Sequence, residues 1–541
     1  MEIPAETKHR FSLYLCYCLL AIVVISFALI RFRLRQIPLE RDEGEYAYAG
    51  QLLLKGLPPY QLVYSAKLPG TYAAYAAMLV VFGQSAAGIH IGLLLVNAAT
   101  TVILFLIMAS LFGRLAALAA ATSYAVLSAD PYMYGLAGHA THFVVFFAVA
   151  GIWFLLKGID SPKPILLFAA GLLFGMAFLM KQPGMLFSLW AVIYLLRQGG
   201  TGPTDWRALS KRLGALIGGA ALPYALACLL MLRAAEFRNF WFWTFTYVRH
   251  YGTEVPIGVG LALLYRSGSL IVKSAPWIWA TSLVGVTAGL WNARARRNSF
   301  FTNSLLLFSF VAVSAGMYYR PHYFILMLPA VSVLMGIAIS SATEILAARA
   351  GHRLIPAIPA LLFAAAVLSS LYSQRKILFQ MTPQEVCEKL YRPNGFPEAF
   401  EVANYVRSHT QPGESIAVLG SEPEIYFYSH RRSATGYIYM YPLLEPQSYA
   451  LEMQGQMMQE IESSRPAMVV LVNVPSSWIA FANFASMQGI AAWARPYLAD
   501  NYVQNGVVEI GYPSTYLWGD AARGYEPKAG YSFLVFKRKQ Q

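Results

Sequence analysis

The sequence predicts a polytopic α-helical membrane protein with a smaller α/β domain at its C-terminal end. Of the 541 residues, 57% are hydrophobic and only 13% are charged, and the mean hydropathy is +0.48. Soluble domains carry roughly 25% charged residues, so the charged share here is far below the usual one. The apolar residues gather in runs of bilayer length, about 20 residues each. Polar residues and short β-like runs return after residue 373.

Hydropathy predicts about eleven transmembrane helices before residue 373. The predicted spans are 12–32, 86–112, 115–130, 143–157, 164–180, 184–197, 213–233, 267–291, 300–319, 322–345 and 354–373. No small-residue cleavage site follows the first apolar run, which favours a retained helix over a removed signal peptide. The apolar stretch 70–82 is too short to cross a bilayer, so we expect it at the membrane surface.

Basic residues predict the sidedness of the loops. The net charge of +14 fits an excess of Lys and Arg in cytoplasmic loops better than nucleic-acid binding. A cytoplasmic N-terminus places most basic loops inside, although Arg31, Arg33 and Arg35 disagree. It also places four polar segments and everything after residue 373 on the extracytoplasmic side. These segments are RDEGEYAYA (41–49), GHATHF (138–143), KQPG (181–184) and YYRPHY (318–323).

The C-terminal segment 374–541 is predicted to form an extracytoplasmic α/β domain. Helix-like pieces such as PEAFEVANYVRSH (397–409) alternate with short β-like runs, a pattern typical of mixed α/β structure. The β-like runs lie at 415–420, 467–473, 507–512 and 532–538.

The first external loop, 36–85, places three carboxylates beside the first span. We expect one helix over 43–55 and a second over 69–83, both amphipathic and lying on the outer membrane surface. Asp42 would be the N-cap of the first helix with Glu45 at its third position, which makes a capping box and explains both acids structurally.

The first external loop also resembles that of a known family. DE-x-x-YA at residues 42–47, a G-x-x-PY turn and K-x-PG before a short apolar helix are similar to polyprenyl-phosphate-sugar glycosyltransferases with the GT-C fold. These include protein O-mannosyltransferases and the aminoarabinose transferase that modifies lipid A. The motif covers 41–83, whereas the overall plan covers most of the chain. The resemblance implies a catalytic transmembrane domain over 1–373 and an external domain over 374–541.

The resemblance implies inverting transfer of a sugar from a polyprenyl phosphate to a hydroxyl of a lipid, glycan or protein, at the inner (plasma) membrane. Asp42 matches the family's base, Glu43 a supporting acid, and Lys67 a lysine that contacts the donor phosphate. Such a reaction needs a base for the hydroxyl proton and a cation for the departing phosphate. The lipid A enzyme carries an acid where this chain has Ala66, so we expect no metal and no other cofactor.

Other ionisable residues on the predicted outer face are candidates for the same cavity. Lys67, Lys181 and Arg320 together would suit a phosphate group, although each alone could reach out to lipid phosphates. The further candidates for the cavity or the acceptor are Asp130, His139, His142, His322, Arg431 and Arg432.

Structural explanations compete for several of these candidates. Asp130 is better explained as a helix cap. His139 and His142, three residues apart, could bind a metal or an acceptor, but solvated interfacial histidines explain them better. Arg431 and Arg432, in the tyrosine-rich segment 420–441, either overhang the cavity or form the basic edge of a strand-rich core.

Two further points stay open. The aromatic stretch 236–252 is typical of an interfacial belt, and it could also guide a polyprenyl tail. A transporter or lipid flippase is an alternative function, compatible with many spans and a cationic cluster. However, no acidic residue lies clearly in the middle of a span to couple ion movement. A non-catalytic receptor or scaffold, acting through the external domain, is the third hypothesis.

Overall fold

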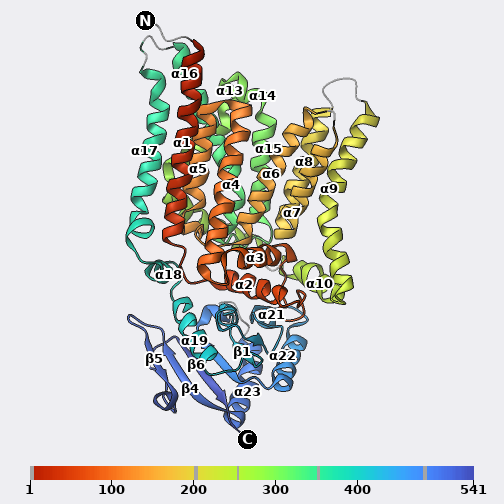
Figure 1. The fold of residues 1–541 in the computed structure, drawn as a ribbon, viewed down its shortest axis with the longest axis vertical. Coiled ribbons are helices and arrows are strands. Elements are labelled where there is room, and N and C mark those ends of the chain that lie inside the picture. The colour runs from red at the N-terminus through yellow and green to blue at the C-terminus, as the bar shows by residue number, and fades with distance from the viewer. Residues whose placement is uncertain are drawn as a thin grey trace.

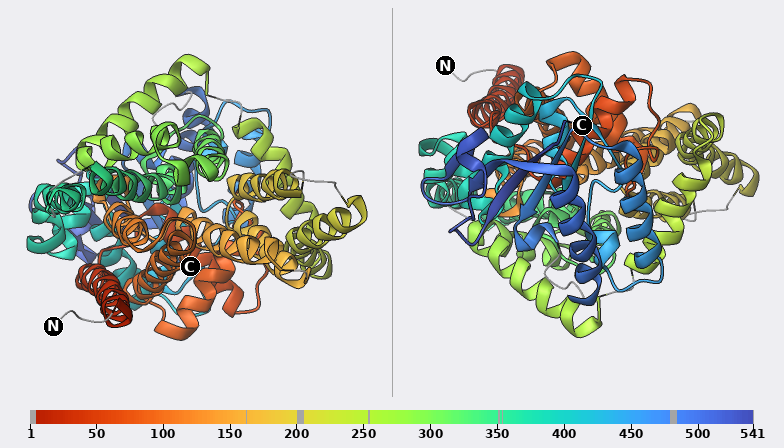
Figure 2. Two further views of the ribbon diagram at one scale, coloured as in Figure 1. Left: turned by 90° about the horizontal axis from the view of Figure 1, so that it is seen from above. Right: turned by 90° about the horizontal axis from the view of Figure 1, so that it is seen from below.

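The protein consists of a bundle of long helices with an α/β domain at one end (Figure 1). The computed structural model describes residues 5–161, 163–199, 205–252, 255–349, 352, 354–478 and 484–540. The first helix begins at the far end of the bundle, whereas the chain ends in the α/β domain. Seen from below, this domain covers much of one end of the bundle (Figure 2).

The helices of the bundle account for the predicted membrane spans. Among the described residues, six helices are long and apolar enough to cross a membrane, or up to seven spans if a bent helix pair is counted as one. The long helices are α1 (Ala5–Arg33), α4 (Ala86–Phe112), α6 (Ala140–Ile159), α9 (Trp206–Arg233), α16 (Leu328–Arg349) and α17 (Ile358–Ser373), with 3-10 turns η4 (Pro321–Met327) and η5 (Ile355–Ala357) before the last two. The shorter helices are α5 (Arg114–Ser128), α7 (Ile165–Met180), α8 (Met185–Gly199), α14 (Ala293–Arg297) and α15 (Ser299–Ser314).

The predicted span 267–291 is wrong as a single helix. Two helices, α12 (Ile257–Ser274) and α13 (Pro276–Trp291), meet there at 106°. Pro276 has no N–H to donate and disfavours helical geometry at the residue before it, and Ala275 is accordingly non-helical, with φ −144° and ψ 56°. Every other predicted span overlaps one helix. The total of about eleven transmembrane helices stays a prediction.

Arg31, Arg33 and Arg35, which do not fit the predicted sidedness, donate hydrogen bonds to backbone carbonyl oxygens. Arg31 donates to the carbonyl oxygens of Ser128 at 2.6 Å and Gly135 at 2.9 Å. Arg33 donates to the carbonyl oxygen of Met381 at 2.5 Å. Carbonyls near a helix C-terminus have no partner within their helix, so a guanidinium there is a structural cap rather than a marker of a cytoplasmic loop.

Helices α2 (Arg41–Leu54) and α3 (Pro69–Phe82) cross the end of the bundle, between it and the α/β domain (Figure 1). Their position agrees with the prediction of two helices in the first external loop. However, α2 is not an amphipathic surface helix, because most of its residues are buried, including Arg41, Glu43 and Glu45. The α/β domain covers the face that was expected to meet solvent.

The capping box of α2 lies earlier than predicted. The carboxylate of Glu40 accepts from the Glu43 amide at 2.9 Å, and Glu43 accepts from the Glu40 amide at 3.4 Å. The predicted box of Asp42 and Glu45 is therefore wrong, since the helix already begins at Arg41. Both of these carboxylates are left for other contacts.

The C-terminal α/β domain contains one six-stranded mixed sheet with the order β2-β1-β3-β6-β4-β5. Strand β1 runs parallel to β2 and β3, whereas β6 pairs antiparallel with β3 and β4. The strands are β1 (Ser415–Leu419), β2 (Arg432–Ser433), β3 (Met468–Asn473), β4 (Tyr502–Glu509), β5 (Thr515–Trp518) and β6 (Ser532–Arg538). The helices are α18 (Pro383–Tyr391), α19 (Phe396–Ser408), α20 (Glu424–Ser429), α21 (Tyr441–Leu444), α22 (Ala450–Ser464) and α23 (Phe484–Asn501). The predicted α/β character is confirmed.

The start of α2 fixes the α/β domain to the bundle. Arg41 donates to the Ser421 carbonyl oxygen at 2.5 Å and to Glu422 Oε1 at 2.7 Å. Gly44 lies directly against α20, where an added Cβ would meet the backbone nitrogen of Glu424 at 2.6 Å. A buried ion pair and a close backbone approach therefore hold the two parts together.

We predict that Gly44→Ala destabilises this junction by about 1–3 kcal/mol, because the methyl group would overlap backbone atoms that cannot turn away. Thermal unfolding of the purified protein in detergent measures the change. Gly214→Ala in α9 is the matched control, since an added Cβ there meets nothing within 4 Å and alanine favours a helix. Equal midpoints for the two variants would contradict the close packing at Gly44.

Candidate functional site

A cavity of about 280 Å³ lies at the end of the bundle that the α/β domain covers. Its ionisable lining residues are Asp42, Glu45, Lys67, Lys181, Arg320, His322 and Glu445, and its tyrosines are Tyr46, Tyr64, Tyr247, Tyr323, Tyr439 and Tyr441. Three segments predicted to share one face, 41–49, 181–184 and 318–323, thus meet around one space. The fold brings together groups that the sequence places far apart.

Lys67 binds two carboxylates in this cavity. Its Nζ donates to Asp42 Oδ1 and to Glu45 Oε2, at 2.7 Å each. Tyr439 donates to Asp42 Oδ1 at 3.0 Å, and Tyr72 donates to Glu45 Oε1 at 2.6 Å. Burial opposes ionisation of Asp42, but the Lys67 ammonium outweighs it and holds the pKa of Asp42 well below its ordinary value. Asp42 is therefore a carboxylate at neutral pH.

The second oxygen of Asp42 faces two histidines. Asp42 Oδ2 lies 3.7 Å from His139 Nδ1 and 3.9 Å from His322 Nε2. The two imidazole rings stack, with centroids 3.9 Å apart and planes 9° apart. His139 is buried, and neither of its ring nitrogens has a hydrogen-bond partner in the described part of the chain. One atom from each of these three residues lies within 4.8 Å of the others, so they could hold a metal ion.

Lys181 and Arg320 add positive charge to the same cavity. Lys181 Nζ lies 3.8 Å from the centre of the Tyr323 ring. Burial lowers the pKa of Lys181 to about 7, against the effect of Asp42, and the charges of Lys67 and Arg320 lower it further. The predicted trio of Lys67, Lys181 and Arg320 lines this one cavity, which is therefore a candidate site for an anion.

Two predicted site residues, Glu43 and Asp130, lie outside the lining of the cavity. Glu43 accepts from the Gly138 amide at 2.6 Å and pairs with His90 Nε2 at 2.9 Å. It therefore anchors the segment before His139 to α2. Asp130 accepts from the Tyr132 amide at 2.8 Å, as a cap of the turn η1 (Pro131–Met133).

Three other candidates lie in structural networks. His142 Nδ1 is 3.1 Å from Asn97 Oδ1, within the helix bundle. Arg431 is buried and donates to Thr410 Oγ1 at 2.8 Å, inside the α/β domain. Arg432 is an exposed residue of β2. Neither arginine lines the cavity, so the expectation that they overhang it is wrong. Tyrosines of the same segment reach it instead.

Sequence reasoning missed several groups of the cavity wall. The predicted capping box gives Glu45 a purely structural role, and no motif distinguishes Tyr439 from the other tyrosines of its segment. Glu445 had no sequence signal. Its carboxylate accepts from the Tyr247 hydroxyl, and burial raises its pKa to about 7. Tyr247 ends the π-helix η3 (Phe242–Tyr247), between α10 (Phe237–Trp241) and α11 (Val248–Tyr251), so the aromatic stretch does reach the cavity.

Comparisons with known proteins agree with this architecture. Residues 67–223 match the family model described as dolichyl-phosphate-mannose-protein mannosyltransferase. No curated protein sequence matches the chain significantly. ArnT from Cupriavidus metallidurans, solved bound to undecaprenyl phosphate, is similar with a TM-score of 0.57 and 16% identity, over 95% of this chain and 97% of ArnT.

A second similar structure is the archaeal oligosaccharyltransferase AglB from Archaeoglobus fulgidus, in complex with an inhibitory peptide and a dolichol-phosphate. Its TM-score is 0.52 at 13% identity, over 94% of this chain and 75% of AglB. At these identities the likeness concerns the fold. The predicted resemblance to GT-C fold glycosyltransferases is confirmed, and so is the predicted fold class of a helical membrane protein with a C-terminal α/β domain. The side of the membrane on which this domain lies stays a prediction.

The cationic trio predicts an anion site that depends on pH. Lys181 is charged below about pH 7 and neutral above it. Sulfate, whose charge is constant in this range, should therefore bind about tenfold more weakly at pH 8.5 than at pH 6. Isothermal titration calorimetry on the purified protein measures this affinity.

The matched variant is Lys181→Arg, because a guanidinium stays charged throughout this range. Its sulfate affinity should therefore change less with pH, and only as far as Glu445 titrates, because burial raises the pKa of that carboxyl to about 7. The same pH dependence in both proteins would show that Lys181 is not the group responsible.

Proposed function

We propose that this protein transfers a sugar from a polyprenyl-phosphate donor to an acceptor hydroxyl on a lipid, glycan or protein. The observation that carries the proposal is one cavity with an ionised carboxylate, Asp42, and three cationic residues, Lys67, Lys181 and Arg320. The family model includes Lys67. The undecaprenyl phosphate in ArnT and the dolichol-phosphate in AglB support a lipid phosphate as the donor.

Asp42 is the proposed general base. It takes the proton of the acceptor hydroxyl while that oxygen attacks the anomeric carbon, and the bond from this carbon to the phosphate oxygen breaks. Attack from the side opposite the phosphate inverts the anomeric centre. The sugar is then bonded to the acceptor oxygen, and polyprenyl phosphate is released as the second product.

Lys67 would link donor binding to activation of this base. Its ammonium group lowers the pKa of Asp42, which makes the carboxylate a weak base. A donor phosphate competes for the same ammonium group. As Lys67 turns toward the phosphate, the pKa of Asp42 rises toward a value better suited to taking a proton.

The three cations would stabilise the charge that develops on the departing phosphate. Arg320 can grip a phosphate with two parallel hydrogen bonds, whereas Lys67 and Lys181 act as point charges. The aromatic stretch 236–252 reaches the cavity through Tyr247 and is a suitable surface for the polyprenyl tail.

We place the protein in the bacterial inner membrane, with its N-terminus cytoplasmic and its α/β domain extracytoplasmic. The basic loops support this orientation. Asp42, the cationic residues and the α/β domain lie at the same end of the bundle, so transfer would take place on the extracytoplasmic side.

Asp42→Asn should abolish transfer, with a loss of about 10²–10⁴-fold, because an amide cannot take the proton. Reconstituted protein with a lipid-phosphate-linked sugar, assayed by mass spectrometry of the glycosylated product, measures the loss. The control is Asp520→Asn, which changes an acid whose side chain is 88% exposed. Undiminished transfer by a folded Asp42→Asn protein would exclude Asp42 as the base.

The same assay, carried out with the protein reconstituted in liposomes, distinguishes sugar transfer from lipid transport. A transporter or lipid flippase would move the donor lipid between leaflets without any glycosylated product. For the proposed enzyme, the anomeric configuration of the product, determined by nuclear magnetic resonance, should be opposite to that of the donor.

We propose that the reaction needs no metal cofactor. Lys67 neutralises one of the two negative charges of Asp42 and Glu45, and Arg320, with Lys181 where it is charged, offsets the other, which opposes a divalent cation. Treatment with EDTA should therefore leave the transfer rate unchanged.

Metal analysis of the purified protein provides the counter-test. A stoichiometric divalent metal that is lost in His139→Ala, together with activity that EDTA removes and metal restores, would instead make Asp42, His139 and His322 a metal centre. A variant that replaces the buried His142 is the matched control, since His142 pairs with Asn97 away from the cavity.

A further inference from the structure

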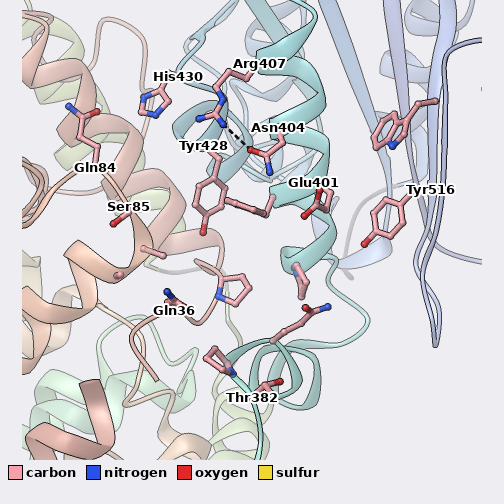
Figure 3. Close-up of a pocket in the computed structure, with 18 residues that line it drawn as sticks. Gln36, Gln84, Ser85, Thr382, Glu401, Asn404, Arg407, Tyr428, His430 and Tyr516 are labelled. Atoms are coloured by element: carbon pink, nitrogen blue, oxygen red, sulfur yellow. Dashed lines mark hydrogen bonds between the residues drawn. The ribbon is translucent and has the colours of Figure 1, made fainter. Parts of the chain in front are cut away.

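A second and larger cleft lies between the bundle and the α/β domain (Figure 3). Its volume is about 1030 Å³, and it shares no lining residue with the candidate catalytic cavity. One wall comes from the segments next to α1 and α4, including Gln36 and Gln84. The other comes from α19 and β5, including Asn404, Arg407 and Tyr516. Clefts between structural units are common ligand sites.

The polar lining of this cleft consists largely of planar groups. Gln36, Gln84 and Asn404 carry amides, and Glu401 and Arg407 carry a carboxylate and a guanidinium. Arg407 and Asn404 lie side by side on α19, with Nη2 donating to Oδ1 at 3.3 Å (Figure 3). Such groups offer paired donors and acceptors that match neighbouring hydroxyls. An alkyl chain would leave them without partners, at a cost in free energy.

Aromatic residues alternate with these polar groups. Phe400 is 42% exposed and Tyr516 is 38% exposed, which is unusual for rings that serve only as core. The indole of Trp518 is held by stacking on Tyr405, with centroids 4.1 Å apart and planes 12° apart. Fixed ring faces beside hydrogen-bonding groups suit a ligand with apolar C–H faces and hydroxyl edges, as a sugar ring has.

The electrostatic surroundings favour a negative ligand. Arg407 lines the cleft, and the positive charges of Lys55, Arg407 and Arg431 act on His430, another lining residue. These three basic groups outnumber the carboxylate of Glu401 in the lining. A saccharide with a carboxylate or phosphate substituent would therefore be preferred to a neutral one.

The cleft also contacts the helix that carries Asp42. Gln51, near the end of α2, lies 2.7 Å from His430 Nδ1, and its Nε2 donates to Gln84 Oε1 at 3.0 Å. Both partners line the cleft. A ligand here would thus contact residues that are hydrogen-bonded to the same helix as the candidate base.

We propose that this cleft is a carbohydrate-binding site, separate from the catalytic cavity, that holds an acidic oligosaccharide. That this saccharide is a part of the acceptor remote from the reacting hydroxyl rests on the proposed function. The binding of carbohydrate itself does not.

Binding of the purified full-length protein to an array of immobilised oligosaccharides, both neutral and bearing uronic acids or phosphates, tests the proposal. We expect binding to acidic members, retained in Asp42→Asn and weakened at least tenfold in Tyr516→Ala and Arg407→Ala. The matched controls are Tyr531→Ala, which changes a tyrosine that is 37% exposed, and Arg523→Ala, which changes an exposed arginine. Neither control residue lines the cleft, so both variants should bind as the wild type does.

Three outcomes would overturn the proposal: no binding to any saccharide, equal binding by the cleft variants and the wild type, or displacement of bound saccharide by vesicles of anionic phospholipid. The last would assign the cleft to a lipid headgroup. Transfer activity without saccharide binding in the cleft would contradict only the proposed carbohydrate site. Saccharide binding without any transfer would support this site but contradict the proposed function.

Discussion

The ion pairs of Lys67 with Asp42 and Glu45 are the interaction on which the cavity depends. Two carboxylates at the closed end of a helix bundle are costly without a counter-charge, and one ammonium at 2.7 Å from each supplies it. The same interaction sets the chemistry, because whatever competes for Lys67 changes the basicity of Asp42. A phosphate is the natural competitor in a cavity that also contains Lys181 and Arg320.

Helix α2 connects the cavity to the α/β domain and to the second cleft. Its first turn carries Asp42, and Arg41 and Gly44 beside it fix the α/β domain. Its last turns bring Gln51 to the wall of the second cleft. The helix is buried on both sides, so neither the cavity nor the junction can change without affecting the other. This explains why a short helix outside the predicted spans is packed as tightly as the core.

Much of the fold follows from local sequence. Runs of apolar residues place the helices of the bundle, and alternating β-like runs place four strands of the C-terminal sheet. The errors come from choices between similar local alternatives. Glu40 and Glu43 form the capping box that Asp42 and Glu45 could also have formed, and Pro276 divides what hydropathy describes as one span. In both cases one or two residues decide the local geometry against the broader pattern.

The sequence by itself determined the membrane helices, the side on which the polar segments gather, and the motif that points to Asp42 and Lys67. These depend on composition and short spacings, which are local properties. Only the tertiary structure decided which charged groups meet. His139 and His322 lie beside Asp42, whereas Glu43 pairs with His90. Tyr439 donates a hydrogen bond to Asp42, although the two are almost 400 residues apart in the sequence. Such contacts depend on how elements that are distant in the sequence pack together, and local sequence patterns do not predict this packing.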